Sequence, residues 1–209
     1  FSQNRLNLNK KIKYLKTHHL NCTINKKNYF TNENNTLGVI YLVRDPRDVL
    51  VSYARHSFYS VKSTLLDMTT SDNCIFTNKN LVNLLGSWSD HYNSWKIINK
   101  NFLLIKYEDL IENKKKEIIK ILGFINNFTK ISISEEKINN CINTTTFENM
   151  KNMEEKGFFE EQAIDEKTGK KINFLHKGKN NQWKDFLDTS TIKKIEENFE
   201  TEMKELKYI

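Results

Sequence analysis

The chain has 209 residues, a formal net charge of +7 and a sequence pI near 9.1, which fit one basic domain over residues 1–209 and a phosphate-bearing ligand. The lysines are spread along the chain, so they indicate a solvated surface more than nucleic-acid binding. Three scattered cysteines indicate neither a disulfide framework nor a zinc site, and with no apolar run of membrane-spanning length we expect a cytoplasmic protein without a membrane span.

Strands and helices alternate in the first half of the chain. Ile12–Thr17 predicts a short strand leading into His18, and the β-branched and aromatic run Leu37–Val43 predicts a buried parallel strand. Asp45 and Pro46 then open a helix predicted to reach Ser60, with Asp as N-cap and proline at the first helical position. This alternation predicts an α/β fold with a parallel sheet.

The second half is predicted to be mainly helical. One further strand is expected at Phe102–Ile105. The expected helices are Lys79–Asn99, Lys114–Leu122 ending at Gly123, Ser134 to about Ile142, and Thr189–Leu206. Three segments are expected to be irregular, namely Ser60–Asn78, a turn from Thr144 to Met153, and a long loop or lid at Lys156–Gln182.

The few arginines cluster where the central strand meets its helix. Of four arginines in the chain, Arg44, Arg47 and Arg55 fall within twelve positions. Arginine binds phosphate in a bidentate manner, and a helix N-terminus at the carboxyl edge of a parallel strand favours anions. The alternative is an exposed helix face with salt bridges to Asp45 and Asp48.

Polar residues follow each expected strand of the sheet. Lys16 and His18 lie at the end of the first strand, Arg44 follows the second, and Tyr107 follows the third. Because carboxyl ends of parallel strands share one edge, we expect these side chains to converge. A histidine there can act as a general base and a lysine can neutralise a leaving oxygen, although each residue alone could be an ordinary strand-end side chain. His19 competes for the same role, since only one of two adjacent strand residues faces the site.

Six short motifs then occur in a single order. They are Lys16-Thr17-His18, Arg44–Asp48 with Ser52, Gly86-Ser87-Trp88, Tyr107–Leu110, Thr145–Phe147, and Lys177-Gly178 followed by Trp183-Lys184. In this order and spacing, the chain from Lys16 to Trp183 resembles the cytosolic-type sulfotransferases. The resemblance implies a P-loop-like three-layer α/β fold with a central parallel sheet flanked by helices. It also implies transfer of a sulfuryl group from 3′-phosphoadenosine 5′-phosphosulfate (PAPS) to a hydroxyl or amine of a small molecule, without a metal.

The resemblance also implies roles for nine residues. His18 would deprotonate the acceptor, and Lys16 would stabilise the transferred group and the leaving phosphate. The donor-binding residues would be Arg44, Ser52, Lys177 and Gly178 at the 3′-phosphate, and Tyr107, Thr145 and Phe147 at the adenine. Gly86-Ser87-Trp88 and Trp183 are expected to serve packing, and Glu108 and Asp109 to serve as caps or ion-pair partners.

The chain departs from the family pattern in four places, one of which is Asn181-Gln182, where Gly-Asp is common before Trp183. Nothing in Phe1–Leu15 resembles the Lys-Ser-Gly-Thr-Thr-Trp phosphate loop that should precede Lys16. Either an N-terminal strand and loop are missing, which we expect, or the protein cannot bind the donor in the usual way. His176 stands where the lid usually has arginine, so donor affinity is expected to be weaker or to depend on acid pH. The family's dimer segment is not matched after Lys184, so no oligomeric state is predicted.

Two other functions are open at this point. A P-loop kinase of small molecules would share the order of strands and helices but would need a Walker-type loop. A non-enzymatic basic nucleotide-binding module would bind in a salt-sensitive way through many lysines. The acceptor is not specified, although Ser60–Asn78 and Lys156–Phe174 are the segments expected to form its pocket.

Overall fold

The centre of the protein is a pair of parallel strands. The computed structural model describes residues 11–24, 28–32, 34–76, 82–158, 163–164, 171–175 and 178–209. Strands β3 (Val39–Val43) and β6 (Phe102–Lys106) pair in parallel, with Val43 opposite Lys106. Helices α4 (Trp88–Lys96) and α6 (Lys114–Asn126) pack against β3 and β6 respectively. The predicted α/β arrangement of a parallel sheet with flanking helices is confirmed.

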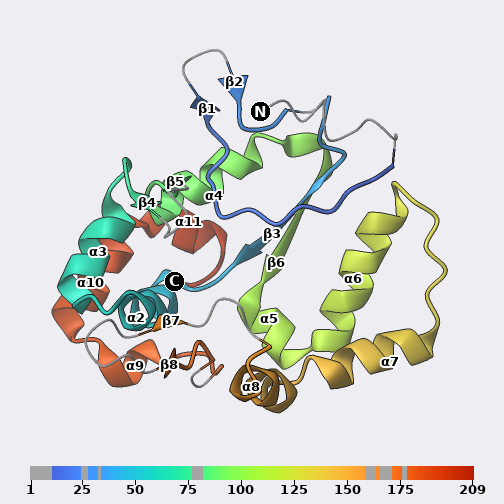
Figure 1. The fold of residues 1–209 in the computed structure, drawn as a ribbon. Helices are drawn as coiled ribbons and strands as arrows, with labels where there is room; N and C mark the ends of the chain where they lie inside the picture. The colour runs from blue at the N-terminus through green and yellow to red at the C-terminus, as the bar shows by residue number, and fades with distance from the viewer. Residues whose placement is uncertain are drawn as a thin grey trace.

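The other described elements surround this pair. Figure 1 shows two groups of helices on either side of the strands, one near α2 and the other near α6. The helices are α2 (Pro46–Ser57), α3 (Val61–Thr69), α5 (Tyr107–Glu112), α7 (Glu135–Thr144), α8 (Phe147–Glu155), α9 (Trp183–Phe186), α10 (Thr189–Asn198) and α11 (Glu200–Glu205), with a 3₁₀ turn at Asn99–Asn101. Three antiparallel pairs of short strands are formed by β1 (Thr23–Ile24) with β2 (Asn28–Tyr29), β4 (Cys74–Phe76) with β5 (Val82–Leu84), and β7 (Ala163–Ile164) with β8 (Lys171–Ile172).

Helix α2 begins as predicted and ends earlier. The side chain of Asp45 accepts a hydrogen bond from the backbone N–H of Arg47, and Pro46 occupies the first turn. Phe58 adopts a left-handed conformation with φ of 57°, which terminates the helix after Ser57. Ser60 instead caps α3, because its hydroxyl accepts a hydrogen bond from the N–H of Ser63. The segment predicted to be irregular therefore begins with a helix.

The main core lies between α2, α3 and the C-terminal helices. Its buried members include Leu50, Met68, Ile195 and Met203. The predicted C-terminal helix Thr189–Leu206 is interrupted at Phe199, which has φ of −119°. The bend keeps the apolar residues before and after it, Ile195 and Met203, in the same core.

The predicted helix Lys79–Asn99 is wrong in its first half. Residues 77–81 lie outside the described part, and Val82–Leu84 form β5 instead. Gly86 has φ of +63°, and Ser87 and Asp90 form a capping box that starts α4 at Trp88. The periodicity of the apolar residues predicted a helix, but the turn chemistry at Gly86 prevailed.

Two other boundaries differ from the prediction. Helix α6 continues through Gly123 to Asn126, and Phe124, the residue after Gly123, packs against Gly38 and Phe128. The turn expected up to Met153 is helix α8, whose N-cap Thr146 accepts a hydrogen bond from the N–H of Asn149. The helix predicted after Ser134 is confirmed as α7.

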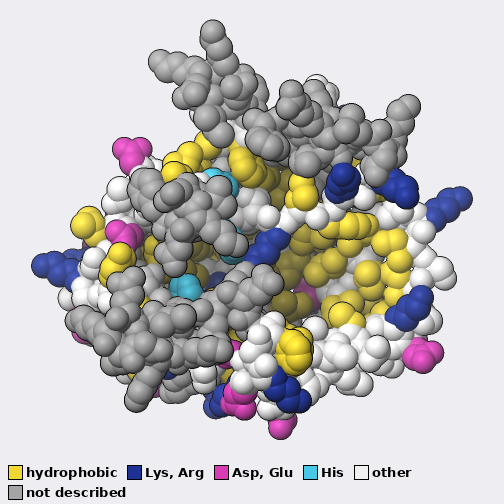
Figure 2. Space-filling view, viewed as in Figure 1, with side chains coloured by type: hydrophobic (Ala, Val, Ile, Leu, Met, Phe, Trp, Pro, Cys, Tyr) yellow, Lys and Arg dark blue, Asp and Glu magenta, His cyan; other side chains and the backbone are white. Residues whose placement is uncertain are grey.

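The predicted strand Ile12–Thr17 is wrong. Residues 11–18 are extended and exposed without strand pairing, and Tyr14 is 66% exposed. In the part of the chain that the structure describes, β3 pairs with β6 alone, and no further strand lies beside β3. Residues 11–18 therefore have no neighbouring strand with which to form backbone hydrogen bonds. Ile40 and Leu42 of β3 are also exposed, and Figure 2 shows hydrophobic side chains gathered on this face.

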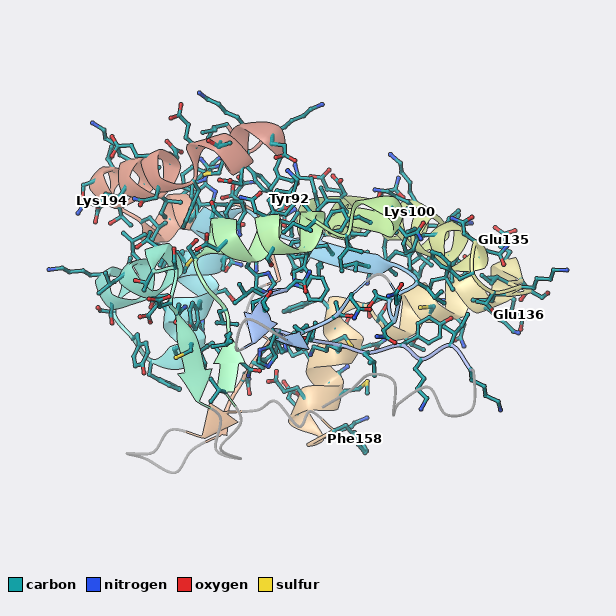
Figure 3. All side chains as sticks on the ribbon, turned by 90° about the horizontal axis from the view of Figure 1, so that it is seen from above. Tyr92, Lys100, Glu135, Glu136, Phe158 and Lys194 are labelled. Carbon is teal, nitrogen blue, oxygen red and sulfur yellow. The ribbon has the colours of Figure 1, made fainter. Side chains whose placement is uncertain are left out.

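Charged side chains cover the outer surface of the helices. Figure 3 shows Glu136 of α7 and Lys194 of α10 at the periphery of the molecule. None of the helices in the described part combines the length and the apolar character required to cross a bilayer.

Candidate functional site

The ends of β3 and β6 bring Arg44 and Tyr107 together. These residues directly follow the paired residues Val43 and Lys106. The guanidinium carbon of Arg44 lies 4.4 Å from the ring centroid of Tyr107, which is a cation–π contact. The expected convergence at one sheet edge is therefore present for these two residues.

The guanidinium of Arg44 retains an unused donor. Its Nη2 donates a hydrogen bond to the carbonyl oxygen of Lys179 at 3.2 Å and lies 3.6 Å from Oδ2 of Asp48. Its Nε is buried and has no hydrogen-bond partner among the residues that the structure describes. Because buried donors are normally paired, this atom fits an anionic ligand at the same place.

A segment from the second half of the chain covers this pair. The hydroxyl of Tyr107 donates a hydrogen bond to the carbonyl oxygen of Gly178 at 3.3 Å. Gly178 has φ of +60°, and a Cβ at this position would overlap the ring of Phe147. Four residues predicted to bind the donor, from four separate segments, thus lie together: Arg44, Tyr107, Phe147 and Gly178.

The other predicted donor residues are less constrained. Ser52 lies on α2, one turn after Asp48, and is exposed. Thr145 is exposed at the junction of α7 and α8, and its hydroxyl donates a hydrogen bond to the carbonyl oxygen of Cys141 at 2.7 Å. Lys177 and His176 lie outside the described residues. The roles of these residues stay predictions.

The two residues predicted to be catalytic, Lys16 and His18, lie in the extended segment that precedes Leu20. Both residues are exposed. Helix α4 holds the backbone next to them, because Trp95 Nε1 donates to the carbonyl oxygen of His19 at 3.0 Å and the N–H of Asn21 donates to Ser94 Oγ at 2.9 Å. The segment is thus attached to the fold although it does not form a strand.

His91 connects this segment to the central strand. Its Nε2 lies 3.2 Å from the carbonyl oxygen of His18, and its Nδ1 lies 2.7 Å from the hydroxyl of Tyr41 on β3. A carbonyl oxygen only accepts hydrogen bonds, so Nε2 carries the proton and Nδ1 of the neutral ring accepts from Tyr41. Burial lowers the pKa of His91 and raises the pKa of Tyr41, which favours this neutral pair.

The two adjacent histidines differ in their contacts. His19 Nδ1 accepts a hydrogen bond from the N–H of Leu84 at 3.2 Å, and its ring lies 5.1 Å from that of Phe30. Burial, with a smaller contribution from the charge of His18, lowers the pKa of His19. His19 thus contacts the fold through its ring, whereas His18 is exposed, and its role as a base stays a prediction.

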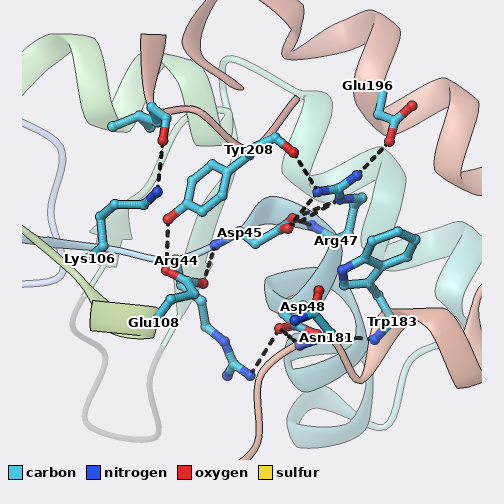
Figure 4. A network of polar contacts seen from close by, with 11 residues as sticks. Arg44, Asp45, Arg47, Asp48, Lys106, Glu108, Asn181, Trp183, Glu196 and Tyr208 are labelled. Atoms are coloured by element: carbon cyan, nitrogen blue, oxygen red, sulfur yellow. Dashed lines mark hydrogen bonds and ion pairs between the residues drawn. The ribbon is translucent and has the colours of Figure 1, made fainter. Parts of the chain in front are cut away.

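Arg47 lies in the interior of the protein. It is 7% exposed, and it donates to both carboxylate oxygens of Asp45, to Glu196 Oε1 at 2.6 Å and to the carbonyl oxygen of Tyr208 at 3.0 Å (Figure 4). Its guanidinium carbon also lies 4.1 Å from the ring centroid of Trp183. The alternative of an exposed helix face therefore predicted the ion pair of Arg47 with Asp45 correctly, but it was wrong about exposure, because Arg47 is buried.

Glu108 connects the same network to the other strand end. Its carboxylate accepts hydrogen bonds from the N–H of Asp45 and from the hydroxyl of Tyr208, both at 3.0 Å. Burial, followed by the charge of Glu108, raises the pKa of Tyr208. Sequence patterns had suggested an ion-pair or capping role for Glu108, but they had not identified Tyr208 or His91. Within the described residues, no cluster of three His, Cys, Asp or Glu side chains could hold a metal ion.

Comparisons with known proteins find a matching family model and similar relatives. A family model described as "Sulfotransferase domain" matches residues 2–207. The amine sulfotransferase of Oryctolagus cuniculus is 31% identical over 186 residues, which are 85% of this chain and 58% of that protein. Sulfotransferase 1E1 of Bos taurus is 29% identical, with coverage of 79% of this chain and 55% of that protein. The chain therefore spans less than two thirds of the length of these relatives.

Two solved structures have similar folds. Mouse sulfotransferase SULT7A1 complexed with PAP has a TM-score of 0.58 and 21% identity, and the match covers 79% of this chain and 58% of that chain. A retinol dehydratase in complex with androsterone and the inactive cofactor PAP has a TM-score of 0.56 and 26% identity, and the match covers 80% and 47% of the two chains.

Proposed function

The chain belongs to the sulfotransferase domain family and has its P-loop-like α/β fold, and from this premise we propose that it is a PAPS-dependent sulfotransferase. The acceptor would be a hydroxyl or amine of a small molecule. The observation that carries the proposal is the convergence of Arg44, Tyr107, Phe147 and Gly178 from four separate segments.

The residues around Arg44 fit a 3′-phosphorylated adenine nucleotide. The unpartnered Nε of Arg44 can donate to the 3′-phosphate, and Ser52 and Lys177 can add further donors. Tyr107 and Phe147 provide aromatic rings for the adenine, with Thr145 two residues before Phe147. Because Gly178 has no side chain, Phe147 can lie directly against its backbone.

The proposed chemistry is an in-line transfer at sulfur. A bond forms between the acceptor oxygen or nitrogen and sulfur, while the bond from sulfur to the 5′-phosphate oxygen breaks and leaves 3′-phosphoadenosine 5′-phosphate (PAP). The exposed imidazole of His18 takes the proton from the acceptor, and the ammonium of Lys16 stabilises the developing negative charge. The contacts from His91 and Trp95 support this role, because they hold the backbone carbonyl groups of the proposed base and of His19 next to it.

The donor preference provides the first test. At equal ligand concentrations PAP should raise the unfolding temperature more than 5′-AMP or ATP, since stabilisation grows with the ratio of ligand concentration to Kd and reaches about 2.7 kcal/mol at 100 times Kd. Arg44→Ala should remove most of the preference. The measurement is a thermal-shift series on this chain and on a form extended at the N-terminus. Equal shifts for all three nucleotides in both forms would count against the proposal and favour the kinase or the basic-module alternative.

The proposed base provides the second test. His18→Ala should retain PAP binding but lower transfer by roughly 10²- to 10⁴-fold, the usual contribution of general acid–base catalysis. Turnover is followed as PAP released from PAPS with a phenol, an aliphatic alcohol and an alkylamine as acceptors. Wild-type turnover in His18→Ala would exclude His18 as the base, and a parallel loss of PAP binding would indicate a structural role instead.

A further inference from the structure

The segment around Gly178 is held at both ends by buried acidic side chains. We propose that Asp48 on α2 and Glu154 on α8 are positioning residues that hold this segment over the donor's 3′-phosphate site. Asp48 and Glu154 make this contact with backbone N–H groups of the segment. The proposal rests on the proposed function for the identity of the ligand.

Glu154 holds the segment before Gly178. The residue is 1% exposed, and its carboxylate accepts hydrogen bonds from the N–H of Phe174 and, at 3.1 Å, from the N–H of Leu175. Each carboxylate oxygen serves one N–H group. No cation pairs with Glu154 among the described residues, so these two donors are what compensates the burial of its charge.

Asp48 holds the segment after Gly178. It is 2% exposed, and its two carboxylate oxygens accept from the N–H of Asn181 at 2.8 Å and from the N–H of Trp183 at 3.1 Å (Figure 4). Oδ2 of the same carboxylate lies 3.6 Å from Nη2 of Arg44. One side chain therefore contacts both the covering segment and the arginine proposed to bind phosphate.

The two carboxylates restrict where Gly178 can lie. Leu175 and Asn181 are each three residues from Gly178, so each hydrogen-bonded end is within roughly 10 Å of it along the backbone. Because each carboxylate uses both oxygens on two N–H groups, it sets the direction of the chain as well as its position. Between these ends, Tyr107 and Arg44 contact the carbonyl oxygens of Gly178 and Lys179.

Helix α8 links the contacts of Glu154 to the aromatic residue Phe147 of the site. It begins at Phe147, whose ring lies against Gly178, and carries Glu154 two turns later. A helix of this length is rigid, so the ring of Phe147 and the carboxylate of Glu154 keep a fixed separation and together fix the position of the segment around Gly178. Loss of the contacts of Glu154 should therefore displace Gly178 while the ion pair between Asp48 and Arg44 is retained.

Glu154→Gln and Asp48→Asn test the proposal with little change in shape. In each variant an amide NH₂ replaces one carboxylate oxygen and faces a backbone N–H, so one of the two hydrogen bonds is lost. Glu155→Gln is the matched control, because Glu155 follows on the same helix and is exposed. Glu154→Gln is the more decisive variant, since Asp48 also pairs with Arg44.

Two measurements are required. Amide hydrogen exchange without ligand should become faster at Phe174–Leu175 in Glu154→Gln and at residues 181–183 in Asp48→Asn, and should be unchanged in Glu155→Gln. The affinity for PAP, measured by calorimetry, should fall at least 10-fold in the first two variants, whereas the affinity for 5′-AMP, which lacks the 3′-phosphate, should stay within 2-fold.

Each other result contradicts a defined part of the proposal. Unchanged exchange in both variants would show that the carboxylates do not hold the segment. Faster exchange with unchanged PAP affinity would exclude a positioning role, and an equal loss of affinity for both nucleotides would indicate a general structural role. If the wild-type protein did not prefer PAP over 5′-AMP, the proposed function and the donor part of this inference would fail, while exchange would still decide whether the carboxylates hold the segment.

Discussion

At the scale of single residues, His91 illustrates how two contacts select one protonation state. Its Nε2 must donate to the carbonyl oxygen of His18, so its Nδ1 is available to accept from Tyr41. A second proton would place a charge in a buried position that faces His18 and His19, whose charges also lower the pKa of His91. The neutral ring is therefore part of the folded structure.

The stability of the protein should accordingly decrease in mild acid. The pKa of His91 is lowered from 6.5, so below that pH the unfolded chain binds more protons than the folded chain. The contribution of His91 to the free energy of unfolding should be fully present above pH 6.5. It should decrease as the pH falls from 6.5 towards the lower pKa of the folded state. The slope for one histidine is at most about 1.4 kcal/mol per pH unit. Urea unfolding of wild type and His91→Gln between pH 7.5 and 5.5 measures this, and an equally steep decrease in both would exclude His91 as the source.

At the scale of elements, α4 is the helix that supports the proposed catalytic segment. Ser87 Oγ accepts from the N–H of Asp90 at 3.1 Å, and Asp90 Oδ2 accepts from the N–H of Ser87 at 3.2 Å, which is a capping box. The helix then presents His91 and Trp95 to the segment that carries His18. Its start is thus set locally, while its contacts are made by residues far away in sequence.

Removal of this cap should destabilise the protein by about 1 kcal/mol. Ser87→Ala leaves N–H groups of the first turn unpaired, which typically lowers stability by that amount and the unfolding temperature by roughly 2–4 °C. Ser63→Ala in the exposed first turn of α3 is the control. Hydrogen bonds from Ser87 lower the pKa of Asp90 below 3.8, so its contribution should be present above this pH and be lost as the pH falls further. An unfolding temperature equal to that of the control would contradict the assignment of the cap.

At the scale of the whole molecule, Arg47 joins the turn of the proposed donor site to the C-terminal part. It contacts Asp45, Glu196 and Tyr208, and Tyr208 in turn donates to Glu108 after β6. Segments separated by more than a hundred residues therefore meet around one guanidinium. This arrangement holds the turn that places Arg44.

Arg47→Ala should consequently be severely destabilising. It leaves the buried carboxylate of Asp45 without its ion-pair partner, a change that costs about 3–5 kcal/mol when a buried pair is broken. Arg55→Ala, an exposed arginine on the same helix, should change stability by less than about 0.5 kcal/mol. Urea or thermal unfolding compares the two variants, and similar values for both would show that the buried network contributes little.

The sequence by itself determined those strands and helix ends that depend only on residues close to one another in the chain. The β-branched run before Arg44 and the Asp-Pro start of α2 specify a strand and a helix through propensity and capping, which act over a few positions. The same locality explains the errors, since Ile12–Thr17 has strand propensity but no partner strand in the described part. The order of short motifs, together with family resemblance, identified the sulfotransferase fold and suggested the residues around Arg44.

Only the tertiary structure decided which of these side chains meet. The stacking of Arg44 on Tyr107 follows from the parallel register of β3 and β6, and the burial of Arg47 follows from the docking of Tyr208. Asp48 and Glu154 bind backbone N–H groups, which every residue except proline carries, so no sequence pattern could indicate their partners. Such contacts depend on how distant segments pack, whereas propensity and capping act within single elements.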